Sequence, residues 1–140
     1  MGEHFQIARL AFFGHSPAFK TADKGDALVK ASEAQGYKLD YLQKAGLASD
    51  KYDRPYDFFR GRVMFTIHNF TGKVVGFGGR TLLSDKKVPK YVNTPETDIY
   101  NKSRILYGLF QAKNSIRKED ECRLVEGYTD VISLSQAGVE

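Results

Sequence analysis

The segment that most constrains the fold is a β-hairpin in the middle of the chain. Residues Arg62–His68 alternate in polarity and are rich in β-branched and aromatic side chains, and the run Lys73–Gly78 follows them. Between the two runs, Asn69–Gly72 has the composition of a tight turn. A short polar turn between two strand-forming runs favours antiparallel pairing. The chain is therefore expected to build a small, mostly antiparallel sheet.

Segments with helical periodicity lie on both sides of this hairpin. Asp23–Gln35 is predicted to be a helix that ends at Gly36, and Leu39–Ala45 a second helix that ends at Gly46. These two segments predict a helical hairpin. After the sheet, the patterns predict a helix at Leu106–Ile116, a strand at Glu121–Val125 and a helix at Tyr128–Ala137. The resulting fold class is α+β.

The composition is typical of one globular domain. The chain has 140 residues, 41% of them apolar and 27% charged. No apolar run approaches the roughly 20 residues of a membrane helix, so no membrane partner is expected and the cytoplasm is the predicted location. Cys122 is the single cysteine, which excludes an internal disulfide and a cysteine-rich zinc site. We expect it to be a buried small apolar residue.

Basic residues are concentrated in the middle of the chain. Arg54–Lys118 holds 13 Lys and Arg against 4 Asp and Glu, a formal charge of +9, whereas the remaining residues carry 8 against 13, or −5. A block of this kind is typical of a surface that meets a polyanion such as nucleic acid. A solvated basic surface without a partner is the alternative, and charge alone leaves both open.

A glycine-rich run, Gly76–Arg80, invites interpretation as a phosphate-binding loop. It lacks the Walker spacing and the Lys-Ser/Thr pair of such loops, so a steric role is favoured. Glycines in a strand let another segment approach the backbone closely. Arg80 projects from the end of this strand, where a guanidinium can make a bidentate contact to phosphate.

Polar, basic and aromatic residues alternate between Lys90 and Lys102. The small polar side chains are those of Asn93, Thr94, Thr97 and Asn101. Lysines with small amide and hydroxyl groups are typical of a groove that reads a nucleic-acid backbone, and Tyr91 and Tyr100 are candidates for stacking on bases. The alternative is an ordered loop whose Asn and Thr side chains satisfy their own backbone.

Two carboxylates, Glu126 and Asp130, lie at the predicted junction of the last strand and helix. Active sites in open α/β sheets gather at the carboxyl ends of strands, where a carboxylate can help hold Mg²⁺ or accept a proton from an attacking hydroxyl. Acidic residues also favour helix N-termini, so a purely local role stays open. One carboxylate is not a metal site, since two-metal chemistry needs several. Glu126 is the candidate catalytic residue and possible metal ligand, with Asp130 in support.

Five motifs follow one another along the chain: Arg60–Phe65, Gly76–Arg80, Pro89–Thr97, Lys102–Gly108 and Glu126–Asp130. Their order and spacing resemble those of bacterial DnaG-type DNA primases. The last of the five motifs resembles the first motif of the Toprim fold in these enzymes. A looser match to the family lies at Phe13–Pro17, Asp26–Leu28 and Ala45–Leu47.

The resemblance implies a helical hairpin and small antiparallel sheet that end in the first βα unit of a Toprim-like fold. Residues 1–118 would be the N-terminal subdomain of a primase catalytic core and residues 119–140 the truncated start of a Toprim domain. Enzymes of this family are DNA-directed RNA polymerases that make short RNA primers from NTPs on a single-stranded DNA template during replication. They depend on Mg²⁺ or Mn²⁺, carry a zinc-binding module upstream, and meet the replicative helicase through another region.

The same resemblance implies roles for individual residues. Arg80, Lys90 and Lys102 would line the template track, and Glu126 would act in proton transfer or beside the metal. Further DNA-binding candidates on this track are Arg60, Arg62, Tyr91, Asn93 and Arg104.

The matching motifs do not make up a whole enzyme. The later acidic Toprim motifs, which would supply the remaining metal ligands, are missing from the sequence, as is the zinc module. The fragment is therefore expected to bind no metal by itself and to be inactive alone. A non-catalytic single-stranded nucleic-acid-binding or interaction module of a phage or mobile-element protein is the alternative interpretation.

Overall fold

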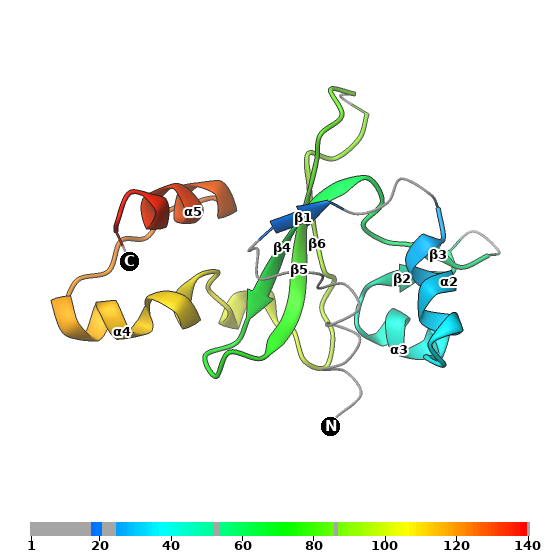
Figure 1. Ribbon diagram of the computed structural model, residues 1–140, viewed down its shortest axis with the longest axis horizontal. Helices are drawn as coiled ribbons and strands as arrows, with labels where there is room; N and C mark the ends of the chain where they lie inside the picture. Colours follow the sequence, from blue (N-terminus) through cyan, green and yellow to red (C-terminus); the bar gives the residue numbers. More distant parts are fainter. Residues whose placement is uncertain (1–17, 21–24, 52–53, 86, 140) are drawn as a thin grey trace.

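The computed structural model of the chain describes residues 18–20, 25–51, 54–85 and 87–139. Its elements are short helices and strands, in the arrangement shown in Figure 1. In chain order they are β1 (Ala18–Lys20), α2 (Ala27–Ala34), α3 (Leu39–Lys44), β2 (Ala48–Ser49), β3 (Tyr56–Asp57), β4 (Arg62–His68), β5 (Val74–Thr81), β6 (Tyr91–Asn93), the 3₁₀ helix η1 (Lys102–Arg104), α4 (Leu109–Glu119) and α5 (Tyr128–Gln136).

A four-stranded antiparallel sheet in the order β1-β4-β5-β6 is the centre of the fold. The predicted hairpin is confirmed as β4 and β5, with β5 extending to Thr81. The side chain of Asn69 builds the turn, because its Oδ1 accepts hydrogen bonds from the backbone N–H groups of Thr71 and Lys73. Gly72 completes the turn at a φ of +84°, a conformation that glycine adopts without strain.

The helical hairpin of α2 and α3 covers one face of the sheet (Figure 1). The buried core between them contains Val29, Leu42, Leu47, Ala48, Phe59, Met64 and Phe77. The predicted stop at Gly36 is confirmed, since this residue follows α2 at a φ of +82°. The two helices thus share one hydrophobic core with β2, β4 and β5.

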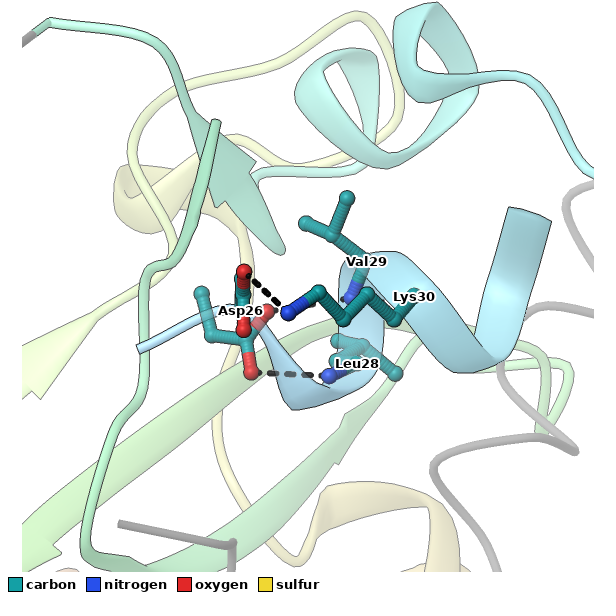
Figure 2. A network of polar contacts seen from close by, with 5 residues as sticks. Asp26, Leu28, Val29 and Lys30 are labelled. Carbon is teal, nitrogen blue, oxygen red and sulfur yellow. Dashed lines mark hydrogen bonds and ion pairs between the residues drawn. The ribbon is translucent and has the colours of Figure 1, made fainter. Parts of the chain in front are cut away.

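A carboxylate from β3 caps the start of α2. Asp57 is buried, and its two oxygens accept hydrogen bonds from the backbone N–H groups of Leu28 at 2.8 Å and Val29 at 3.1 Å. Figure 2 shows these bonds at α2 together with the exposed ion pair of Lys30 and Asp26. A carboxylate at this position satisfies free N–H groups of the first turn and complements the helix dipole.

The opposite face of the sheet packs against the C-terminal part of the chain. A second core joins Ile67, Val75 and Tyr100 to the partly buried residues Ile105, Tyr107 and Tyr128. In Figure 1, α4 and α5 lie to the left of the sheet and α2 and α3 to the right. Among the described residues, no helix combines the length and apolar character needed to span a membrane.

The α+β class is confirmed, but near the C-terminus one predicted helix is shifted along the chain and one predicted strand is absent. The helix expected at Leu106–Ile116 begins only at Leu109, because Gly108 has a φ of +84° and interrupts the helical backbone. The strand expected at Glu121–Val125 is irregular backbone, and Leu124 is 80% exposed. Within the described residues this segment pairs with no other strand, and an extended segment without ladder hydrogen bonds has little stability.

Two further expectations concern single segments. Cys122 is exposed and not buried, because the segment around it is not part of a core. The motif at Phe13–Pro17 lies outside the described residues.

Candidate nucleic-acid interface

The pairing of β5 with β6 gathers a group of basic, aromatic and amide side chains. Arg80 lies opposite Tyr91, and Gly78 lies opposite Asn93. Residues two positions apart on a strand share one face, so Arg80, Tyr91 and Asn93 lie on the same side of the sheet. Exposed Lys90 comes directly before β6. These four residues are named the β5–β6 strip below.

Arg80 and Tyr91 interact directly within the strip. The guanidinium carbon of Arg80 lies 5.7 Å from the centre of the Tyr91 ring, which is a cation–π distance. Tyr91 is 39% exposed. The pair therefore places a cation next to a partly exposed aromatic ring. Proteins that bind single-stranded nucleic acids use these two groups for phosphate contact and base stacking.

Glycines in β5 make close packing possible on both faces of the strand. A Cβ atom at Gly78 would lie 2.6 Å from the ring of Tyr128, and one at Gly79 would lie 2.7 Å from the ring of Phe59. Real Cβ atoms do not approach neighbours this closely. The steric interpretation of Gly76–Arg80 is therefore confirmed, and a phosphate-binding loop is excluded because the run lies within the strand β5.

Tyr128, the first residue of α5, joins the C-terminal helix to the strip. Its ring stacks on Phe65 at a centroid distance of 5.0 Å and meets Tyr107 edge-on at 4.7 Å. Its hydroxyl donates a hydrogen bond to Oδ1 of Asn93 at 2.8 Å. Burial, reinforced by nearby Tyr100 and Tyr107, raises the pKa of the Tyr128 phenol to about 12. The hydroxyl therefore stays protonated and available as a donor near neutral pH.

The sequence did not single out Tyr128, although it carried one signal for it. Gly78 is a glycine within a paired strand, and such a glycine often marks a site where another group approaches the backbone. The approaching group is the Tyr128 ring. The partner of that glycine is 50 residues away in the sequence, and spacing alone does not identify it.

Arg62 does not join the strip, contrary to the sequence-based expectation. It is 6% exposed, and its guanidinium donates hydrogen bonds to the carbonyl oxygens of Gly79 at 3.2 Å and Pro89 at 3.0 Å. The pairing register puts Arg62 and Arg80 on opposite faces of the sheet, since Arg62 pairs with Thr81. Burial lowers the pKa of Arg62 from its ordinary value. Its position fits a role in holding the chain before Lys90.

The segment after β6 uses most of its small polar side chains internally. The Thr94 hydroxyl accepts a hydrogen bond from Phe77 N, the Thr97 hydroxyl accepts one from Tyr100 N, and Asn101 caps η1 through Ser103 N. For Thr97 and Asn101 the interpretation as a self-satisfied loop is confirmed, whereas Thr94 bonds to the backbone of β5. Asn93 differs from these residues, because its side chain accepts a hydrogen bond from the distant Tyr128 in α5.

Tyr100 is not available to stack on a base. It is 5% exposed and packs with Ile67 and Val75 in the second core, against Gly76. An aromatic residue in a polar stretch was expected at the surface, but the missing side chain of Gly76 leaves room for this ring in the core.

Three further basic candidates are exposed but separate. Arg60 places its guanidinium 5.6 Å from the centre of the Tyr56 ring, and Lys102 and Arg104 are exposed on η1. Within the described part of the chain, no hydrogen bond, ion pair or ring contact joins these three to the β5–β6 strip. They extend the basic surface without belonging to the strip itself.

The two candidate carboxylates lie just before and within the start of α5. Glu126 is exposed, and Asp130 accepts a hydrogen bond from Gly127 N at 3.1 Å as part of a helix-capping arrangement. Among the described residues, no group of three or more His, Cys, Asp or Glu side chains is placed to hold a metal ion. The described residues therefore do not fit a Mg²⁺ or Mn²⁺ site of their own, and Asp130 has a local structural role.

Comparison with known proteins agrees with this geometry. The family described as "DNA primase catalytic core, N-terminal domain" matches residues 7–113. A DNA primase of Halalkalibacterium halodurans is 44% identical over 139 residues, which is 98% of this chain and 21% of that protein. A DNA primase of Escherichia coli O6:H1 is 48% identical over 137 residues, 97% of this chain and 22% of that protein.

Solved structures show the same fold. The structure of a DnaG primase catalytic domain bound to single-stranded DNA is 40% identical, with a TM-score of 0.72 over 98% of this chain and 40% of that one. The chain spans about a fifth of the length of the curated relatives it matches. With most of its residues matched by the family and by these relatives, the chain belongs to the N-terminal domain family of the bacterial DNA primase catalytic core.

Proposed function

We propose that this chain binds the single-stranded DNA template of a primase, through the β5–β6 strip. The observation that carries the proposal is the placement of Arg80, Tyr91 and Asn93 on one face, with Lys90 at its end. A guanidinium and an ammonium bind phosphates, an exposed aromatic ring stacks on bases, and an amide hydrogen-bonds to either. The related DnaG catalytic domain that was solved with single-stranded DNA supports the assignment.

The exposed basic residues outside the strip would widen this track. Arg60, Lys102 and Arg104 each offer a cation to solvent in the basic middle of the chain. Such residues contribute to affinity by releasing counterions from the phosphates, without reading sequence. Arg62 would act on DNA only indirectly, through the backbone that it holds.

The parent reaction would be primer synthesis by a DNA-directed RNA polymerase. The relatives are named DNA primase, and this chain would contribute the template track plus Glu126 as a proton-transfer or metal-associated residue. The fragment is proposed to be inactive alone. The parent protein would bind NTPs, an RNA primer, a replicative helicase and Mg²⁺ or Mn²⁺. It would work on the chromosome in the cytoplasm.

The proposed division of the chain falls at the end of α4. Residues 1–118 would form the N-terminal subdomain and 119–140 the start of the Toprim domain. The backbone supports a boundary here, because Asp120 has a φ of +53° and ends α4, and the irregular segment before α5 follows. Tyr128 then docks the second part on the sheet of the first.

A binding titration tests the template assignment. Fluorescence anisotropy of a labelled thymidine oligonucleotide should show binding by this chain at about 50 mM NaCl that weakens strongly by about 200 mM. The double variant Lys90→Ala, Lys102→Ala should bind more weakly. The matched control Lys38→Ala, Lys44→Ala removes two exposed charges at α3, on the far side of the sheet, and should bind nearly as tightly as the wild type. Absence of binding at low salt, or equal binding by the double variant, would remove the assignment.

A further inference from the structure

The hydrogen bond from Tyr128 to Asn93 is not explained by template binding alone. It joins residues 35 positions apart and links the segment that carries Glu126 to the β5–β6 strip. Glu126 lies two residues before Tyr128 in the same short stretch. The same hydrogen bond holds α5 against β6 and also fixes the side chain of Asn93, which is proposed to bind DNA.

The hydrogen bond from Tyr128 determines which polar atom of the Asn93 side chain can meet DNA. An asparagine side chain has one acceptor, Oδ1, and one donor group, Nδ2. Oδ1 of Asn93 is occupied by the Tyr128 hydroxyl at 2.8 Å. Among the described residues, Nδ2 of Asn93 donates no hydrogen bond. The side chain is half-buried, so its donor remains available to an outside acceptor.

The tyrosine is held firmly enough to impose this orientation. Its ring is fixed between Phe65 and Tyr107 and lies over Gly78, where no side chain separates ring and backbone. Gly78 is also the residue that pairs with Asn93 across the two strands. The hydroxyl and the amide are thus positioned by the same piece of backbone.

We propose that Tyr128 is a positioning residue: its hydroxyl orients the Asn93 amide so that Nδ2 donates to an acceptor oxygen of single-stranded DNA. The proposal rests on the proposed function, since it assumes that the β5–β6 strip binds DNA. The same bond also holds Glu126 beside the template, because Glu126 lies two residues before Tyr128 and Tyr128 contacts the β5–β6 strip. The amide is neutral, so this contact adds affinity without releasing a counterion.

The test compares two tyrosines of the same aromatic cluster. Tyr128→Phe removes the hydroxyl bonded to Asn93 and keeps the ring, whereas Tyr107→Phe removes a hydroxyl for which no bond to the strip exists among the described residues. Loss of one hydrogen bond should weaken binding of a thymidine oligonucleotide about twofold to tenfold in Tyr128→Phe and leave Tyr107→Phe unchanged. The salt dependence should keep its slope in Tyr128→Phe, and Lys90→Ala should reduce it by about 0.7.

A double-mutant cycle separates positioning from stability. In an Asn93→Ala background, Tyr128→Phe should cause no further loss of affinity, because the amide that it orients is gone. Equal losses with and without Asn93 would overturn the proposal. So would wild-type affinity in folded Tyr128→Phe.

A spectroscopic measurement decides the case if Tyr128→Phe does not fold. In the wild-type chain, the side-chain amide NMR signal of Asn93 should shift on addition of the oligonucleotide, and an unchanged signal in bound protein would contradict the proposal. If the wild-type chain binds no oligonucleotide at all, the proposed function fails instead. Binding with an unaffected Asn93 amide overturns only the inference about Tyr128.

Discussion

Arg62 donates a hydrogen bond to the carbonyl oxygen of Pro89 at 3.0 Å, and so ties β4 to the residue that precedes Lys90. The same guanidinium also bonds to the carbonyl of Gly79 in β5. A buried arginine with these partners fixes the backbone from which the β5–β6 strip begins. The structure thus gives Arg62 a supporting role where a direct DNA contact was expected.

Replacing Arg62 by lysine should distinguish these two roles. Arg62→Lys keeps the charge but loses the planar guanidinium that reaches two carbonyl groups. We expect destabilisation of about 1–3 kcal/mol and weaker DNA binding, with displaced backbone NMR signals at Pro89's neighbours Val88 and Lys90. If Arg62 met DNA directly, the lysine variant would keep most of its affinity and those backbone signals would not move.

A side chain at Gly78 should disrupt the contact between the sheet and α5. In Gly78→Ala the new methyl group meets the Tyr128 ring at 2.6 Å, and overpacking of this kind costs about 1–3 kcal/mol. Urea unfolding measures the loss. Gly25→Ala is the matched control. Among the described residues, the atom nearest to its new Cβ atom is an Arg60 side-chain nitrogen at an ordinary 3.6 Å. Equal stability of the two variants would show that α5 does not pack on β5 as described.

Removal of the Asp57 carboxylate should destabilise α2. Asp57→Ala leaves the N–H groups of Leu28 and Val29 without their acceptor, at a cost of about 1–3 kcal/mol. Asp57→Asn retains one acceptor oxygen and should recover part of the loss. Denaturant unfolding of both variants measures these differences. An alanine variant as stable as the wild type would contradict the cap.

Alkaline pH should weaken the folded state through Tyr128. The phenol titrates near pH 10 when unfolded, and burial raises its pKa to about 12 in the folded chain. The folded state therefore holds this proton more tightly, so its stabilisation is complete below about pH 10 and is lost as pH rises through about 12. Urea midpoints should fall across this window, and fall less in Tyr128→Phe. Parallel curves for the two proteins would exclude a raised Tyr128 pKa.

Local patterns predicted much of the fold. The alternating run Arg62–His68 and the turn at Asn69 set the hairpin, and Gly36 ends α2, because each depends on neighbours in the sequence. The prediction of a strand at Glu121–Val125 was wrong, because a strand depends on residues that are distant in the sequence. A strand needs a partner, and no periodicity within five residues shows whether the fold supplies one.

The candidate site was predicted residue by residue but not as an arrangement. Arg80, Lys90, Tyr91 and Asn93 were chosen for their chemistry, and the pairing of β5 with β6 brings them together. The sequence could not show that Arg80 and Arg62 lie on opposite faces of the sheet, because the face of each arginine depends on the pairing register. Tyr100 and Tyr128 likewise owe their places to glycines on β5, far from them in the sequence.

The most direct test of the template track is an NMR map of the bound chain. Backbone and side-chain signals are recorded as a thymidine oligonucleotide is added at low salt. The signals of α2 and α3 on the opposite face should stay unchanged, while the largest shifts should fall on Arg80, Lys90, Tyr91 and Asn93. Shifts concentrated on α2 and α3, with the β5–β6 strip unaffected, would contradict the template track.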